Sequence, residues 1–122
     1  MRAIFMRTSW LMALALIGGA GSAAAQDSKT FTGIASYYSK NYSGKTASGE
    51  KYDETKFTAA HRTLPFGTRV VVTDVKTKRS VTVRVNDRGP FIKGRVIDLS
   101  YAAAGEMRMH GRGLAKVTAV AE

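Results

Sequence analysis

Three ionisable residues, Glu50, His61 and Asp87, each lie beside a turn signal in the sequence. Two carboxylates and an imidazole that met in one groove could cleave a glycosidic bond by acid–base chemistry. One carboxyl group would give its proton to the leaving oxygen. A second group would stabilise the oxocarbenium-like centre or take a proton from the attacking hydroxyl. The spacing of the three residues along the chain does not by itself bring them together.

Each of these residues also has a purely structural interpretation. A glutamate that follows a glycine turn, as Glu50 does, is most often solvated. Asp87 could form a surface ion pair with Arg88 or Arg95, which would contribute little to stability. His61 could be a half-buried structural histidine. On these residues alone, both interpretations stay open.

Other residues fit catalytic or metal-binding chemistry less well. Asp98 lies in an apolar, strand-like segment, and we expect it to accept hydrogen bonds from buried backbone N–H groups. His110 is given no role. Two histidines 49 residues apart and the absence of cysteine make a poor metal site, so we expect neither a metal nor another cofactor.

The stretch 81–100 is the segment that must position Asp87. Alternating residues predict a strand that runs into Asp87-Arg88-Gly89-Pro90, and a second strand-like piece follows at Arg95–Leu99. Glycine admits unusual dihedral angles and proline fixes its own φ, so the chain turns there. A carboxylate at the junction of a strand and a turn is held on a rigid support.

The remaining pattern is that of a small β-protein. Alternation and β-branched residues predict strands at 30–38, 57–61, 69–74, 80–86, 95–99 and 114–120. Ser100 is expected to cap a helix over 101–107, and Asp53 a single helical turn over 53–56. About six short strands joined by glycine-containing connections favour a closed or nearly closed barrel.

The N-terminus has the three regions of a secretory signal peptide. Arg2 and Arg7 precede a short apolar run, and Ala23-Ala24-Ala25 supplies a small-residue cleavage site. We therefore expect residues 1–25 to be removed and residues 26–122 to form one domain that is periplasmic or secreted. Without cysteine, neither a disulfide nor an N-terminal lipid anchor is expected.

The predicted mature chain is strongly basic. Residues 26–122 contain 17 Lys or Arg and nine Asp or Glu, a net charge of +8. Such a surface favours a polyanionic partner. Export and the scattered basic residues make nucleic acid the least favoured of these, so we expect an acidic cell-wall polymer and no nucleic acid.

Five segments together resemble one bacterial family. They are G-I-A-S-Y-Y (33–38), T-A-S-G-E (46–50), T-A-A-H-R-T-L-P-F-G-T (58–68), V-R-V-N-D-R-G-P-F (83–91) and G-R-V-I-D-L-S-Y-A-A-A (94–104). In this order they are similar to the RlpA family, the "rare lipoprotein A" septal-ring lytic transglycosylases. The resemblance implies a mainly β fold, a six-stranded double-psi β-barrel with one or two short helices.

The same resemblance implies a reaction. Family members cleave the β-1,4 bond between N-acetylmuramic acid and N-acetylglucosamine in peptidoglycan, leave a 1,6-anhydro end and act in cell-wall remodelling or daughter-cell separation. Asp87 would be the general acid, and Glu50 and His61 would orient the sugar or tune Asp87. A carboxylate close to Asp87 would favour its protonated form.

The expected sugar contacts are inferred from residue type. Aromatic side chains could pack on sugar faces and basic ones could meet the lactyl carboxylate of muramic acid. The candidates are Tyr37, Tyr38, Arg62, Arg88, Phe91 and Lys93.

Two departures from the family leave alternatives open. The sequence lacks the lipid-anchoring cysteine of some members, and it stops at Glu122, where others continue into a peptidoglycan-binding module. Both would weaken tethering to the septum. A non-catalytic, expansin-like wall-binding module therefore remains the main alternative, with a partner-binding barrel as a third. We expect a monomer.

Overall fold

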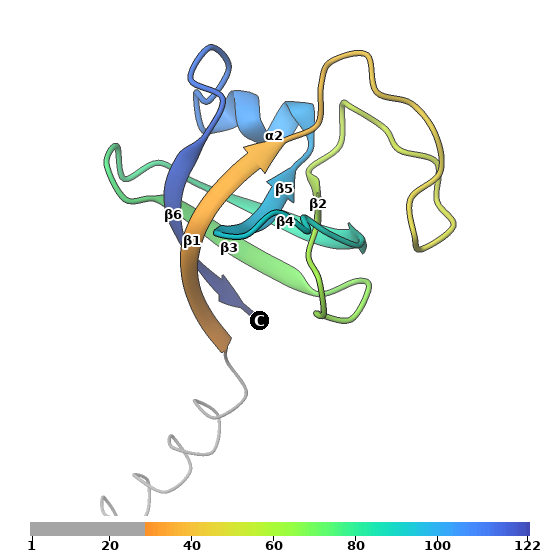
Figure 1. Ribbon diagram of the computed structural model, residues 1–122, viewed down its shortest axis with the longest axis horizontal. Coiled ribbons are helices and arrows are strands. Elements are labelled where there is room, and N and C mark those ends of the chain that lie inside the picture. The colour runs from red at the N-terminus through yellow and green to blue at the C-terminus, as the bar shows by residue number, and fades with distance from the viewer. Residues whose placement is uncertain (1–28) are drawn as a thin grey trace, which may run out of the picture.

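The computed structural model describes residues 29–122, which form a closed six-stranded barrel with one short helix (Figure 1). The predicted signal peptide lies outside the described residues. The elements are β1 (Lys29–Tyr37), β2 (Thr58–Ala60), β3 (Arg69–Asp74), β4 (Ser80–Asp87), β5 (Arg95–Leu99), α2 (Tyr101–Glu106) and β6 (Ala115–Ala121). The expected mainly β barrel is therefore confirmed, and each expected strand is present within two residues of its predicted bounds.

The strand order around the barrel is β1-β5-β2-β4-β3-β6. Two pairs, β1 with β5 and β2 with β4, run parallel, and the other four pairs run antiparallel. Because the barrel closes on itself, each strand among residues 29–122 has a neighbour on both sides. The long loop between β1 and β2 projects from one side of this barrel, at the right of Figure 1.

The barrel interior is filled by the alternate residues of each strand. In β4, Val81, Val83 and Val85 are buried, whereas Thr82 and Arg84 between them are partly exposed. The small apolar residues of β6 alternate in the same way. This two-residue period separates an apolar inner face from a polar outer face.

The helix begins where the sequence predicted and ends one residue earlier. The Ser100 side chain accepts a hydrogen bond from the Ala103 N–H, so the cap is confirmed, and Met107 is the C-cap. The helical turn predicted at 53–56 is wrong. These residues form a turn closed by the Lys56 N–H, which donates to the Asp53 carbonyl, and Asp53 Oδ1 accepts from Thr55 N and Oγ1, as in an Asx turn.

Within residues 29–122, no helix has the length and apolar character needed to cross a membrane.

Gly33 provides a test of how closely β1 and β5 pack. The register shifts so that Ile34 pairs with Arg95 and Ala35 with Ile97, which leaves Val96 as an extra residue on β5. A Cβ on Gly33 would lie 2.4 Å from Cγ1 of Val96. We predict that Gly33→Ala lowers the free energy of unfolding by about 1–3 kcal/mol, measured by urea denaturation. The same substitution should be milder in a Val96→Ala background. An equal loss in both backgrounds would contradict this packing.

Candidate active site on the outer face of the barrel

Four neighbouring strands place a row of residues side by side. In the strand registers, Ser36 of β1 pairs with Asp98 of β5, Asp98 pairs with Ala60 of β2, and Ala60 pairs with Asp87 of β4. Directly paired residues point to the same face of a sheet. Since Ile97 and Leu99 are buried inside the barrel, Asp98 and its row point outward.

A β-bulge in β4 turns Asp87 to this outer face. Ala59 pairs with Val85 and Ala60 pairs with Asp87, so Asn86 is an extra residue. Strict alternation after the buried Val85 would have sent the Asp87 side chain into the barrel. Bulges re-aim side chains in this way and are common beside active sites. The bulge is therefore what makes the Asp87 carboxylate accessible.

Three donors hold the Asp87 carboxylate. Ala47 N–H and Arg88 N–H donate to Oδ1 at 2.8 and 2.9 Å, and the Tyr38 hydroxyl donates to Oδ2. A carboxylate oxygen has two lone pairs, so Oδ2 keeps one for a proton or a ligand. Burial, followed by the hydrogen bond to Asp87, raises the pKa of Tyr38, and its hydroxyl therefore remains a donor.

Asp98 supplies the second carboxyl group of the row. The Ser36 hydroxyl donates to Asp98 Oδ1. Burial raises the pKa of Asp98, and the negative charge of Asp87 adds to this effect, while Ser36 and Arg95 act in the opposite direction. The expectation that Asp98 accepts backbone N–H bonds is wrong, because the residue points to the outer face and its partner there is a hydroxyl.

Glu50 lies beside the same strand end but binds other residues. Arg84 donates two hydrogen bonds to its carboxylate, each 3.1 Å, and Asn86 Nδ2 donates one at 2.8 Å. Arg84 and then Asn86 lower the pKa of Glu50, which is therefore held as a carboxylate. Asp98, by contrast, has its pKa raised in part by the charge of Asp87.

His61 contacts Asp87 through the backbone. Its N–H donates to the Asp87 carbonyl at 3.1 Å, and its Nδ1 accepts from the N–H groups of Thr63 and Leu64, both at 3.1 Å. The ring packs against Phe31, with centroids 4.9 Å apart. Within residues 29–122, no hydrogen bond joins the side chain of His61 or Glu50 to the Asp87 carboxylate. Their predicted catalytic roles stay predictions.

The predicted arginine contacts go to backbone carbonyls. Arg62 Nη1 donates to the carbonyls of Pro90 and Arg95, at 3.1 and 2.7 Å. Arg88 Nη1 donates to those of His61 and Leu64, at 3.2 and 2.8 Å. These bonds tie together the two loops that flank Asp87. In the described part of the chain, Asp87 has no ion pair with Arg88 or Arg95, so that structural alternative is not what fixes Asp87.

The other predicted sugar contacts differ in exposure. Tyr38 stacks on Tyr52 with ring centroids 4.6 Å apart, in addition to its bond to Asp87. Tyr37 packs against Tyr101 at one end of the barrel. Phe91 is 78% exposed and Lys93 is also exposed. Their binding roles stay predictions, as does the absence of a cofactor; among residues 29–122, no group of three His, Cys, Asp or Glu side chains could hold a metal ion.

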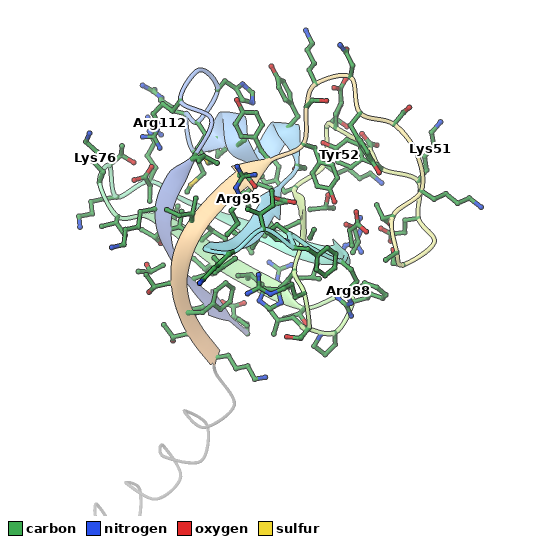
Figure 2. The ribbon with its side chains drawn as sticks, in the orientation of Figure 1. Lys51, Tyr52, Lys76, Arg88, Arg95 and Arg112 are labelled. Atoms are coloured by element: carbon green, nitrogen blue, oxygen red, sulfur yellow. The ribbon has the colours of Figure 1, made fainter. Side chains whose placement is uncertain are left out.

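A cleft of about 660 Å³ opens between the β1–β2 loop and β4. We call it the Tyr52 cleft; Tyr42, Glu50, Tyr52, Arg84 and Asn86 are among its lining residues. Tyr52 and Lys51 lie on the loop at the right of Figure 2. Neither Asp87 nor His61 lines this cleft. It adjoins Asp87 through Asn86 and through the stack of Tyr52 on Tyr38.

Solved structures of similar shape share this architecture. "Streptomyces papain inhibitor (SPI)" is 25% identical, with a TM-score of 0.62, over 77% of this chain and 96% of that one. The apo Clavibacter michiganensis expansin is 22% identical, with a TM-score of 0.61, over 77% and 50% of the two chains. Together with the six-stranded closed barrel and its two parallel strand pairs, these likenesses place the chain in the class of double-psi β-barrels.

Sequence relatives identify the family. The family model described as "Lytic transglycolase" matches residues 30–119. "Endolytic peptidoglycan transglycosylase RlpA" of Pasteurella multocida (strain Pm70) is 56% identical over 86 residues, which are 70% of this chain and 29% of the relative. The protein of the same name from Campylobacter jejuni is 50% identical over 90 residues, 73% and 33% of the two chains. The chain belongs to the RlpA family of lytic transglycosylases, and it spans about a third of the length of these relatives.

The hydrogen bonds of His61 predict its tautomer. Because Nδ1 accepts two N–H bonds, the proton of the neutral ring must be on Nε2. Burial first, and then the charges of Arg62 and Arg88, lower the pKa of His61 below its ordinary value of about 6.5. We expect a neutral Nε2–H imidazole at pH 6.5 in long-range ¹H–¹⁵N NMR spectra. A proton on Nδ1 or a charged ring at that pH would contradict the geometry.

The lowered pKa of His61 also predicts how the stability of the fold depends on pH. The unfolded chain binds the His61 proton more readily, so the free energy of unfolding should fall as the pH drops below about 6.5 through the folded pKa. His61→Asn places a carbonyl oxygen near the Nδ1 position but does not titrate. Its unfolding should therefore lose the His61 part of this pH dependence.

Proposed function

We propose that the chain is an exported lytic transglycosylase that cleaves the MurNAc-β-1,4-GlcNAc bond of peptidoglycan within glycan strands. The observation that carries the proposal is the outward-facing carboxylate of Asp87, held by three donors beside a second carboxyl group, Asp98. The names of the relatives support the substrate and the endolytic mode. They describe proteins about three times longer, so the activity is inferred for this barrel.

The reaction needs one proton donor and no positioned water. The proton of Asp87, carried on Oδ2, passes to the glycosidic oxygen O4 of N-acetylglucosamine as the bond between that oxygen and C1 of muramic acid breaks. The C6 hydroxyl of the same muramic acid attacks C1 and returns its proton to Asp87. One bond to C1 is exchanged for another, the 1,6-anhydro ring forms, and Asp87 ends in its starting state.

Asp98 and Tyr38 support this proton transfer. Burial and the negative charge of Asp87 favour the protonated form of Asp98, so the two carboxyl groups disfavour the doubly ionised state. Tyr38 fixes the orientation of Oδ2. Glu50, held ionised by Arg84, is a positioning residue or a ligand for sugar hydroxyls rather than a proton donor. His61 positions Asp87 through the backbone.

The remaining assignments extend the same proposal. The exposed Phe91 and Lys93 flank the strand end and are available to the glycan, whereas Arg62 and Arg88 chiefly brace the loops. The net charge of +8 over residues 26–122 attracts a polymer that carries carboxylates. The protein would act as a monomer without a lipid anchor, in the periplasm or outside the cell, after removal of residues 1–25.

The second candidate is a non-catalytic wall-binding module. It is favoured by the likeness of the barrel to expansins, one of which, a point mutant, was solved in complex with cellohexaose (TM-score 0.58). Such a module would sediment with isolated sacculi, more weakly at high salt, and would create no anhydro ends.

Substitution of Asp87 separates the two candidates. We predict that Asp87→Asn lowers the release of 1,6-anhydro products from sacculi at least a hundredfold, because the amide cannot supply the proton. Mass spectrometry of the digests measures this release. Glu106→Gln, which removes a charge from the exposed surface of α2, serves as the matched control and should retain activity. Undiminished release by Asp87→Asn would remove Asp87 from its role, and no release by the wild type would favour the wall-binding module.

A further inference from the structure

A second cleft lies beside Ser36, the partner of Asp98, and shares Lys40 with the Tyr52 cleft. It has a volume of about 570 Å³, and its lining includes Ser36, Tyr37, Lys40, Arg95, Tyr101 and Leu114. We call it the Tyr37 cleft. Ser36 is also the residue whose hydroxyl donates to Asp98, so one wall of the cleft touches the carboxyl pair directly. Figure 2 shows Arg95 over the middle of the barrel and Tyr52 to its right.

An aromatic platform borders the Tyr37 cleft. The rings of Tyr101 and His110 stack with centroids 3.9 Å apart and an interplanar angle of 22°. The Tyr37 ring lies 5.3 Å from that of His110. His110 is exposed and is fixed by a 2.9 Å hydrogen bond between Nε2 and the Tyr101 carbonyl. Flat, partly exposed rings held in this way offer apolar faces to a sugar ring.

Gly105 leaves room for the stack of Tyr101 and His110. A Cβ built on Gly105 would lie 3.1 Å from Cε1 of His110, so a larger residue there would press on the imidazole. The glycine in α2 therefore leaves room for the ring against Tyr101. Neither this platform nor His110 has a role in the reaction proposed above, and the barrel core does not include the exposed His110 ring.

Two cationic side chains on the Tyr37 cleft favour a negatively charged ligand. Within residues 29–122 the Arg95 guanidinium has neither a hydrogen bond nor an ion pair, and Lys40 is exposed on the same cleft. Arg95 is near enough to Asp98 to lower its pKa, in opposition to burial. An unpaired guanidinium beside an aromatic platform fits an amino sugar that carries a carboxylate.

We propose that the Tyr37 cleft, which meets the Tyr52 cleft at Lys40, is a subsite for an acidic amino sugar of the glycan. A polymer cut at Asp87 extends to both sides of the scissile bond, and the row from Asp87 to Ser36 connects the two clefts. This assignment rests on the proposed function, because it takes the glycan strand as the ligand.

The test uses the full chain carrying Asp87→Asn, so that glycan binds without being cut. Two probes are compared by NMR and calorimetry: a peptide-free tetrasaccharide of alternating N-acetylglucosamine and N-acetylmuramic acid, and the neutral N-acetylglucosamine tetramer. The acidic probe should perturb the amide signals of Tyr37, Tyr101 and His110 and bind more tightly. Tyr101→Ala should weaken its binding about threefold to tenfold, whereas Tyr101→Phe, which keeps the ring, should not.

Further variants test the role of charge and guard against a loss of folding. Arg95→Gln should abolish the difference between the two probes, whereas Lys76→Gln, at the left edge of the barrel in Figure 2, should preserve it. If Tyr101→Ala fails to fold, His110→Ala removes the exposed half of the stack instead and should weaken binding as well.

Two outcomes would overturn the subsite. They are perturbations confined to the Tyr52 cleft, or no perturbation by either probe. If the wild type still releases anhydro products in that case, the proposed function stands and only the subsite fails. Binding at the Tyr37 cleft by a wild-type protein that releases no anhydro products would instead retain the subsite and overturn the enzyme.

Discussion

Two carboxyl groups are held on the outer face of the barrel with a single alanine between them, and the site depends on that arrangement. Ala60 pairs with Asp87 on one side and with Asp98 on the other. The strand spacing alone puts the two backbones about 10 Å apart, and the small, buried Ala60 leaves the space above it to their side chains. The bulge at Asn86 is the condition for this, because without it Asp87 would follow Val85 into the core. The loops on either side are then fixed by bonds to the same strand end, from Ala47 and through Arg88.

The carboxyl groups near this pair differ from it in their partners. Glu50 and Asp74 are neutralised by Arg84 and Arg112, so these carboxylates stabilise loops. Asp98 has a hydroxyl partner and no ion pair among the described residues, and burial works against its ionised form. In such an environment a second negative charge is unfavourable, so the two carboxyl groups resist being ionised together. Arg95 acts in the opposite direction, because its positive charge favours the ionised form of Asp98.

The sequence was sufficient for the elements and insufficient for the side-chain partners. Alternating valines predicted β4, and Ser100 before three alanines predicted the start of α2, because these signals are local. Asp53 was mistaken for a helix cap because an Asx turn uses the same residue type.

A bulge leaves no local signal, so the outward turn of Asp87 could not be predicted from the alternation that precedes it. Asp98 could have been placed correctly, since it alternates with Ile97 and Leu99, but its partner Ser36 lies 62 residues away in the sequence. The hydroxyl bond from Tyr38 to Asp87 was missed for the same reason, and Tyr38 was expected to contact sugar.

We infer that Asp87 and Asp98 form one electrostatic unit, because the charge of Asp87 raises the pKa of Asp98. Carboxyl ¹³C NMR titration of selectively labelled aspartate measures it most directly. We predict that Asp98 titrates above the ordinary aspartate pKa of about 3.9, and that its midpoint moves down when Asp87 is replaced by asparagine, because the charge that opposes its ionisation is gone. A midpoint for Asp98 at or below that ordinary value, or one that is unchanged by the Asp87→Asn substitution, would show that the two carboxyl groups are independent.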